Sequence, residues 1–164
     1  MEPSINPGGA SLQLILLVVF VLIAILFLMT EQNTLRTIRL ENRQMPPGQV
    51  WLQLIPLFGQ LWQFVVVTRI AGSLRNEIAS WDADSILGTE AAAVAQENNR
   101  PTFGIGIAYC TLNVLVIALN ATVRDVMPGI MAILALSEMA CWISYWATLA
   151  GYKRKLRQKN LATL

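Results

Sequence analysis

The sequence predicts an all-α integral membrane protein with three transmembrane helices and a proline-broken segment, residues 49–68, that either re-enters the membrane or forms a fourth span. Composition indicates this class, because 55% of the 164 residues are hydrophobic and only 13% are charged, about half the charged share of an average soluble domain. Three apolar runs are also long enough to cross a bilayer. At this length we expect one polytopic membrane domain, residues 1–164.

The residue inventory excludes several kinds of chemistry. The chain has no histidine, which excludes serine–histidine catalysis, histidine-ligated haem or zinc, and metalloproteases with two histidines on one helix. Its two cysteines are too few for a four-thiolate metal site. We therefore predict that the protein is not an enzyme and has no catalytic, cofactor-binding or metal-binding residues. A bound lipid, or a pigment ligated without histidine, stays open.

Residues 11–30 form the first predicted span, because no polar residue occurs between positions 14 and 29 and about 20 apolar residues cross a bilayer core. No basic segment precedes this run and no signal-peptide cleavage pattern follows it, so we interpret it as a permanent span. We expect the helix to continue as a basic extension over residues 31–44. Its three arginines would share one face and contact anionic lipid headgroups or water (Arg36, Arg39 and Arg43).

Residues 49–68 would make a poor span, because Pro56 lies at the centre and Gln53, Gln60 and Gln63 follow one face of a helix as a polar seam. If the segment spans the membrane, eight basic residues lie on the cytoplasmic side and four outside. If it re-enters, eleven lie inside and only Arg124 lies outside. The positive-inside rule favours the re-entrant arrangement. Both arrangements place the C-terminus in the cytoplasm.

Two cytoplasmic patches of opposite charge flank the last two spans. The first is an acidic loop, residues 76–100, and the second is a basic tail, residues 153–164. The acidic residues are Glu77, Asp82, Asp84, Glu90 and Glu97, and the basic residues are Lys153, Arg154, Lys155, Arg157 and Lys159. We expect the tail to contact anionic headgroups.

Residues 103–123 and 126–152 are the remaining predicted spans, and a short turn joins them into an antiparallel hairpin. Residues at equal depth in such a hairpin have numbers that sum to about 251. This rule pairs Asn113 with Glu138, Cys110 with Cys141, and Gly106 with Tyr145. Small residues allow close helix approach in membranes, so we expect the hairpin to pack through Gly106, Cys110, Cys141 and Ser144.

Glu138 lies near the middle of the last span, where a charged side chain is costly. We expect it to accept hydrogen bonds from amide side chains and to belong to a polar intramembrane seam: Glu138, Asn113, Asn120, Gln53, Gln60 and Gln63. Three interpretations stay open. The seam could hold the helices together, contact a partner subunit, or pass protons or cations.

Residues 33–73 contain the segments N-T-L-R, M-P-P-G-Q-V-W-L-Q-L-I-P-L-F-G-Q-L-W-Q-F and R-I-A-G-S-L. This stretch resembles small multi-pass bacterial membrane proteins of unknown function that share a P-G…W…I-P…L block. The resemblance covers about a quarter of the chain. It implies a bacterial origin and a functional role for residues 49–68, and it brings no activity and no site residues.

Two functions fit these features. The first is a non-catalytic accessory or scaffold subunit of a larger complex in the bacterial inner (plasma) membrane, binding partner subunits through small-residue helix faces and charged patches. The alternative is a small channel or transporter for protons, ions or small solutes, using Glu138 and the glutamine and asparagine seam. In either case we expect anionic lipids and membrane proteins as partners, and no nucleic acid.

Overall fold

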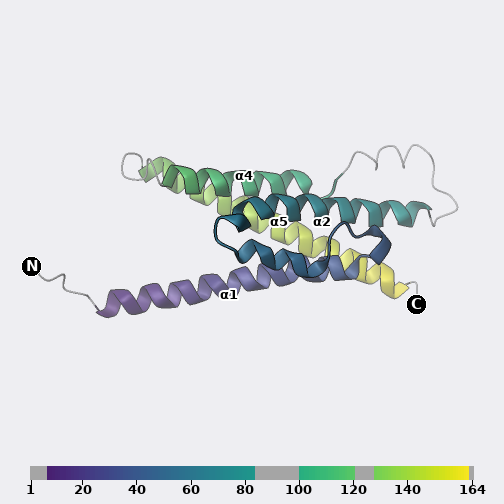
Figure 1. The fold of residues 1–164 in the computed structure, drawn as a ribbon, viewed down its shortest axis with the longest axis horizontal. Helices are drawn as coiled ribbons and strands as arrows, with labels where there is room; N and C mark the ends of the chain where they lie inside the picture. Colours follow the sequence, from purple (N-terminus) through teal and green to yellow (C-terminus); the bar gives the residue numbers. More distant parts are fainter. Residues whose placement is uncertain (1–6, 84–99, 121–127, 163–164) are drawn as a thin grey trace, which may run out of the picture.

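The computed structural model describes residues 7–83, 100–120 and 128–162, and it describes side chains from residue 11 to 81, 100 to 120 and 128 to 161. In this part of the chain all regular structure is helical (Figure 1). The elements are α1 (Pro7–Thr37), η1 (Leu40–Asn42), η2 (Pro47–Leu54), α2 (Phe58–Ala83), α4 (Phe103–Asn120) and α5 (Pro128–Ala162), where η denotes a 3₁₀ helix.

Three of the described helices are long and apolar enough to cross a membrane: Ser11–Thr37, Phe103–Asn120 and Pro128–Leu161. This confirms the all-α class and the three predicted spans as candidate membrane helices. The helix α2, which includes the second half of residues 49–68, is not among the three.

The helix α1 ends at Thr37, so residues 31–37 of the predicted helical extension over residues 31–44 are helical, whereas residues 38–44 do not continue the helix. The chain becomes extended at Arg39, where φ is −58° and ψ is 145°. A distant carboxylate holds this conformation, because the backbone N–H of Arg39 donates to Oε2 of Glu77 at 3.1 Å. A tertiary contact thus replaces the next helical hydrogen bond, and the three arginines do not share a helix face.

Residues 49–68 do not form one helix. The 3₁₀ helix η2 ends at Leu54, and α2 begins at Phe58 after a turn in which Leu57 has a left-handed φ of 63°. Pro56 suits this turn because it has no backbone N–H to donate. The helices η2 and α2 pack against each other and both contact α1. Figure 1 shows that the turn lies part-way along the bundle, short of the end where α1 begins.

The helices α4 and α5 form the predicted antiparallel hairpin, and α5 runs parallel to α1 (Figure 1). Asn160 Nδ2 donates to the carbonyl of Thr37 at 3.1 Å, which joins the C-terminal ends of α1 and α5. The helix α5 continues without a break to Ala162. The predicted basic tail is therefore the last part of this helix. The start of α1 and the end of α5 lie at opposite ends of the molecule.

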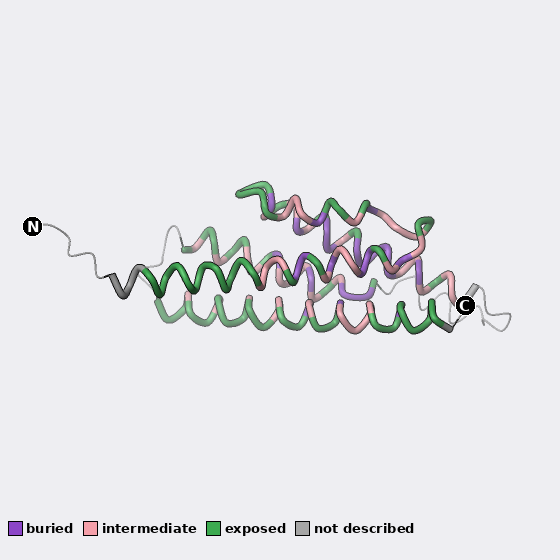
Figure 2. The backbone as a smooth tube through the Cα atoms, turned by 90° about the horizontal axis from the view of Figure 1, so that it is seen from below, coloured by how far each residue is buried: buried purple, intermediate pink, exposed green. Residues whose placement is uncertain are grey.

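The hydrophobic core lies towards the end of the molecule where α1 and α5 terminate (Figure 2). From Ser11 to Leu22 the helix α1 is exposed, whereas Leu35, Leu74 and Leu149 are buried from three different helices. Gly106 marks a close approach of α4. A Cβ on this residue would lie 2.4 Å from Cγ1 of Val67 and 3.0 Å from Cε2 of Tyr145. The hairpin therefore brings Gly106 against Tyr145, as the depth rule predicts.

The predicted acidic loop begins later than expected, because α2 continues to Ala83 and residues 76–83 are helical. Glu77 is buried instead of exposed. The rest of the predicted loop, with Asp84, Glu90 and Glu97, lies outside the described residues.

Candidate functional site

A chain of polar side chains crosses three helices in the centre of the predicted seam. Gln63 on α2 donates from Nε2 to Oδ1 of Asn113 at 3.1 Å and to Oε1 of Gln60 at 3.4 Å. Asn113 on α4 donates in turn from Nδ2 to Oε1 of Glu138 on α5. We call these four residues the amide–acid chain. Its carboxyl group can hold or release a proton, and its amides hold that group in place.

Two residues of the predicted seam lie elsewhere. Gln53 belongs to η2, so it cannot continue the row formed by Gln60 and Gln63 on α2. The prediction of a single polar seam from Gln53 to Gln63 is therefore wrong, because a turn between η2 and α2 separates the two residues. Asn120 is exposed at the end of α4.

Of the four residues predicted to pack the α4–α5 hairpin, three are buried or partly buried and one is exposed. Gly106 and Cys110 are buried, and Cys141 is partly buried. Neither cysteine forms a disulfide. Ser144 is exposed and its hydroxyl donates to the carbonyl of Ala140, so this residue does not lie between α4 and α5 as predicted.

A second polar cluster surrounds Glu31 on α1, whose side chain is only 1% exposed. Gln53 Nε2 donates to Oε2 of Glu31 at 2.6 Å, which joins η2 to α1. The buried hydroxyl of Tyr145 on α5 lies near the same carboxyl group without hydrogen-bond geometry to it. One turn before Glu31, Phe27 meets the edges of four aromatic rings at centroid distances of 5.5 to 6.4 Å. Tyr145 is one of these four rings, so the aromatic cluster lies beside the buried carboxyl group.

A third cluster surrounds Glu77 on α2, which is also 1% exposed. Its Oε1 accepts from Nε of Arg39 at 3.2 Å, and its Oε2 accepts from Nδ2 of Asn42 at 2.8 Å. The hydroxyl oxygen of Ser80 accepts further hydrogen bonds from the same two residues, through Nη2 of Arg39 and Nδ2 of Asn42. The cluster fastens the segment after α1 onto α2. Arg39 therefore has an internal partner, which corrects its assignment to the lipid headgroups.

The remaining predicted headgroup contacts lie at the same end of the bundle. Arg43 donates to the carbonyls of Ile38 and Arg36 at 2.8 and 2.9 Å, so it covers one carbonyl in the last turn of α1 and one just after that helix. The side chains of Arg36, Arg154, Lys155, Arg157 and Lys159 are exposed, and that of Lys153 is partly exposed. Two of these ammonium groups lie over aromatic rings, Lys155 over Tyr152 at 5.4 Å and Lys159 over Trp81 at 6.0 Å.

Sequence reasoning missed Glu31 as an interior residue, although a signal is present. Glu31 follows Leu28 by three positions and precedes Leu35 by four, so all three share one helix face. Glu77 likewise follows Leu74 by three positions. An acid in register with an apolar stripe indicates a buried carboxyl group, and only the fold shows what it meets.

No family model matches the chain, and the searches of curated proteins and of solved structures found no significant match. The resemblance of residues 33–73 to small bacterial membrane proteins therefore rests on the sequence pattern alone. Within the described residues, no group of three or more histidine, cysteine, aspartate or glutamate side chains could hold a metal ion.

Proposed function

We propose that the protein is a non-catalytic accessory or scaffold subunit of a larger complex in the bacterial inner membrane. One observation carries the proposal. The helix α5 presents an outward strip of small residues, here called the small-residue strip: Ser137, Ala140, Ser144 and Thr148, all exposed. Its three hydroxyls donate to carbonyls of their own helix. The strip is therefore smooth, and a second helix could approach it closely.

The internal clusters support the same function. The carboxyl groups of Glu31 and Glu138 accept hydrogen bonds from amides of neighbouring helices. They join segments of this chain in a membrane, where unpaired polar groups are costly. The acidic patch contributes less than the sequence indicates, because Glu77 is internal. The basic end of α5 stays available as a charged surface.

We propose further that α1, α4 and α5 cross the membrane and that η2 and α2 form a re-entrant hairpin. The turn between η2 and α2 is strongly apolar and open, with Leu57 84% exposed and Leu61 69% exposed. Such a tip is suited to lipid or to a partner helix and not to water. Because α1 and α5 run parallel, this arrangement puts the N-terminus outside and the C-terminus in the cytoplasm.

The strip is tested by placing a bulky side chain on it. We expect Ser144→Phe to reduce co-purification of a membrane partner by at least about fivefold, because an added ring prevents close helix approach. The measurement is a gentle-detergent pull-down of the tagged protein from native membranes, with mass spectrometry and particle sizing. The matched control is Met139→Phe, on an exposed apolar face of the same helix. A wild-type protein that runs as a lone monomer would contradict the proposal, and so would equal behaviour of the two variants.

The second candidate function is a small channel or transporter, and the amide–acid chain favours it. The chain joins α2 to α5 without a gap and contains one titratable group, Glu138. Under this function, Glu138→Gln should reduce proton or cation flux in proteoliposomes to the background of empty vesicles, while thermal unfolding changes little. Glu41→Gln is the matched control, because Glu41 is an exposed acid outside the chain. Unchanged flux in Glu138→Gln excludes this candidate.

A further inference from the structure

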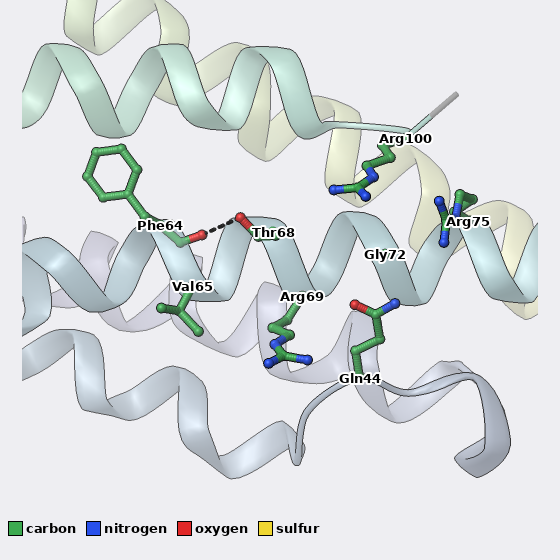
Figure 3. Close-up of a pocket in the computed structure, with 8 residues that line it drawn as sticks. All are labelled: Gln44, Phe64, Val65, Thr68, Arg69, Gly72, Arg75 and Arg100. Atoms are coloured by element: carbon green, nitrogen blue, oxygen red, sulfur yellow. Dashed lines mark hydrogen bonds between the residues drawn. The ribbon is translucent and has the colours of Figure 1, made fainter. Parts of the chain in front are cut away.

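A cleft of about 450 Å³ opens between α2, the segment before α4 and the linker that joins η1 to η2 (Figure 3). Three arginines contribute to its lining, Arg69 and Arg75 from α2 and Arg100 from the start of the next described segment. The other lining residues are Gln44, Phe64, Val65, Thr68 and Gly72. None of these residues belongs to the polar clusters described above.

The positive charge in this cleft has no counterpart in the described part of the chain. Both ion pairs found there involve Arg39, and no described carboxylate lies within ion-pair distance of Arg69, Arg75 or Arg100. The guanidinium of Arg100 lies over the ring of Phe103 at 5.6 Å, so it is held at the start of α4. Three like charges around one cavity repel each other and attract an anion.

The side-chain amide of Gln44 is a neutral hydrogen-bond donor in the lining of the cleft, and two contacts hold this residue in place. The backbone N–H of Gln44 donates to Oγ of Ser73 at 2.9 Å. A Cβ on Gly72 would lie 2.2 Å from Oε1 of Gln44, so only glycine at this position lets the amide lie against α2. Figure 3 shows this amide beside Arg69 and facing the side of α2 that carries Gly72.

The opposite end of the cleft is apolar. Figure 3 places Phe64 and Val65 at the end away from Arg75 and Arg100. Val65 and Leu61, four positions apart on α2, are both exposed, and so is Leu57 at the tip of the η2–α2 hairpin. A ligand with an anionic head and a hydrocarbon chain matches this gradient, whereas a small inorganic anion would use only the charged end.

We propose that this cleft binds an anionic phospholipid, with its phosphate group against Arg69, Arg75 and Arg100 and an acyl chain along Phe64 and Val65. Guanidinium groups suit this role because their paired N–H donors match phosphate oxygens. Gln44 supplies a further donor. The site goes beyond the proposed subunit function and does not depend on it, because the protein alone supplies every group.

The test compares lipid binding by two variants with equal loss of charge. The cleft variant combines Arg69→Gln, Arg75→Gln and Arg100→Gln, and the control combines Arg36→Gln, Arg154→Gln and Arg157→Gln, which are exposed positions elsewhere. Native mass spectrometry of the purified protein in neutral detergent would measure binding of phosphatidylglycerol, phosphatidylcholine and inorganic phosphate. The control loses the same charge from predicted surface contacts with headgroups, so we expect the cleft variant to bind phosphatidylglycerol at least about tenfold more weakly than the control.

Each other outcome overturns the proposal. Equal weakening in the two triple variants would show a general effect of net charge. Equal binding of phosphatidylglycerol and phosphatidylcholine would show no preference for an anion. Binding of inorganic phosphate as tight as that of phosphatidylglycerol would identify a free phosphate as the ligand. If the triple variant does not fold, Arg69→Gln alone is the test, because this side chain is exposed, and an unchanged affinity would then overturn the site.

Discussion

Replacing Glu77 with alanine should lower the free energy of unfolding by about 3 kcal/mol, the lower end of the range for breaking a buried ion pair. The lower end applies because Arg39, the partner of Glu77, is 39% exposed and water can solvate it after the change. The substitution also removes the hydrogen bonds that Glu77 accepts from the backbone N–H of Arg39 and from the amide of Asn42, which keeps only its longer bond to Ser80. The measurement is unfolding in mixed detergent micelles with increasing dodecyl sulfate, followed by far-ultraviolet circular dichroism.

The chain supplies a matched control for this prediction. Glu41 pairs with the same Arg39 at 3.6 Å, but its side chain is 69% exposed. Exposed pairs contribute little, so Glu41→Ala should change the free energy of unfolding by less than about 0.5 kcal/mol. Equal effects of the two substitutions would contradict the prediction, because they would mean that burial of Glu77 adds nothing to the contribution of its ion pair to the free energy of unfolding.

The second large effect is expected at the turn between η2 and α2. A Cβ on Gly59 would lie 2.0 Å from the carbonyl oxygen of Gln53 and 2.7 Å from its carbonyl carbon. These are backbone atoms, which cannot move aside as a flexible side chain can. Gly59→Ala should therefore reduce the free energy of unfolding by about 3 kcal/mol, the upper end for overpacking.

Gly48→Ala is the control for this substitution, because a Cβ at Gly48 would meet nothing within 4 Å. Removing a glycine where the added methyl group fits stabilises a protein by about 0.4 to 1 kcal/mol, mainly through the unfolded chain. The two variants should thus shift the same unfolding transition in opposite directions. A neutral Gly59→Ala would show that η2 and α2 do not pack as closely as the structure has them.

The hairpin of η2 and α2 links the prediction for Gly59 to the proposed function. Gln53 near the end of η2 reaches Glu31 on α1, and Gln63 on α2 reaches Asn113 on α4. Displacing the turn would pull on both contacts. We therefore expect Gly59→Ala to weaken partner binding and stability together, whereas Ser144→Phe should affect binding alone.

The helical class, the three candidate spans and the α4–α5 hairpin could be predicted from the sequence, because they depend on local properties of the chain. Apolar length sets a span, and a short turn sets which residues of two adjacent helices share a depth. The contact between Asn113 and Glu138 was predictable for this reason. The pairing of Gly106 with Tyr145 follows from the same geometry.

In contrast, contacts between distant segments set which polar residues are internal and where a helix ends. Arg39 leaves the helix because Glu77, 38 positions away, accepts its backbone N–H. Gln53 separates from Gln63 because the turn at Leu57 reverses the chain and presents η2 to Glu31. The three arginines of the cleft come from two segments that fold against each other. Periodicity shows which residues share a face of one helix, whereas burial depends on what another part of the chain places against that face.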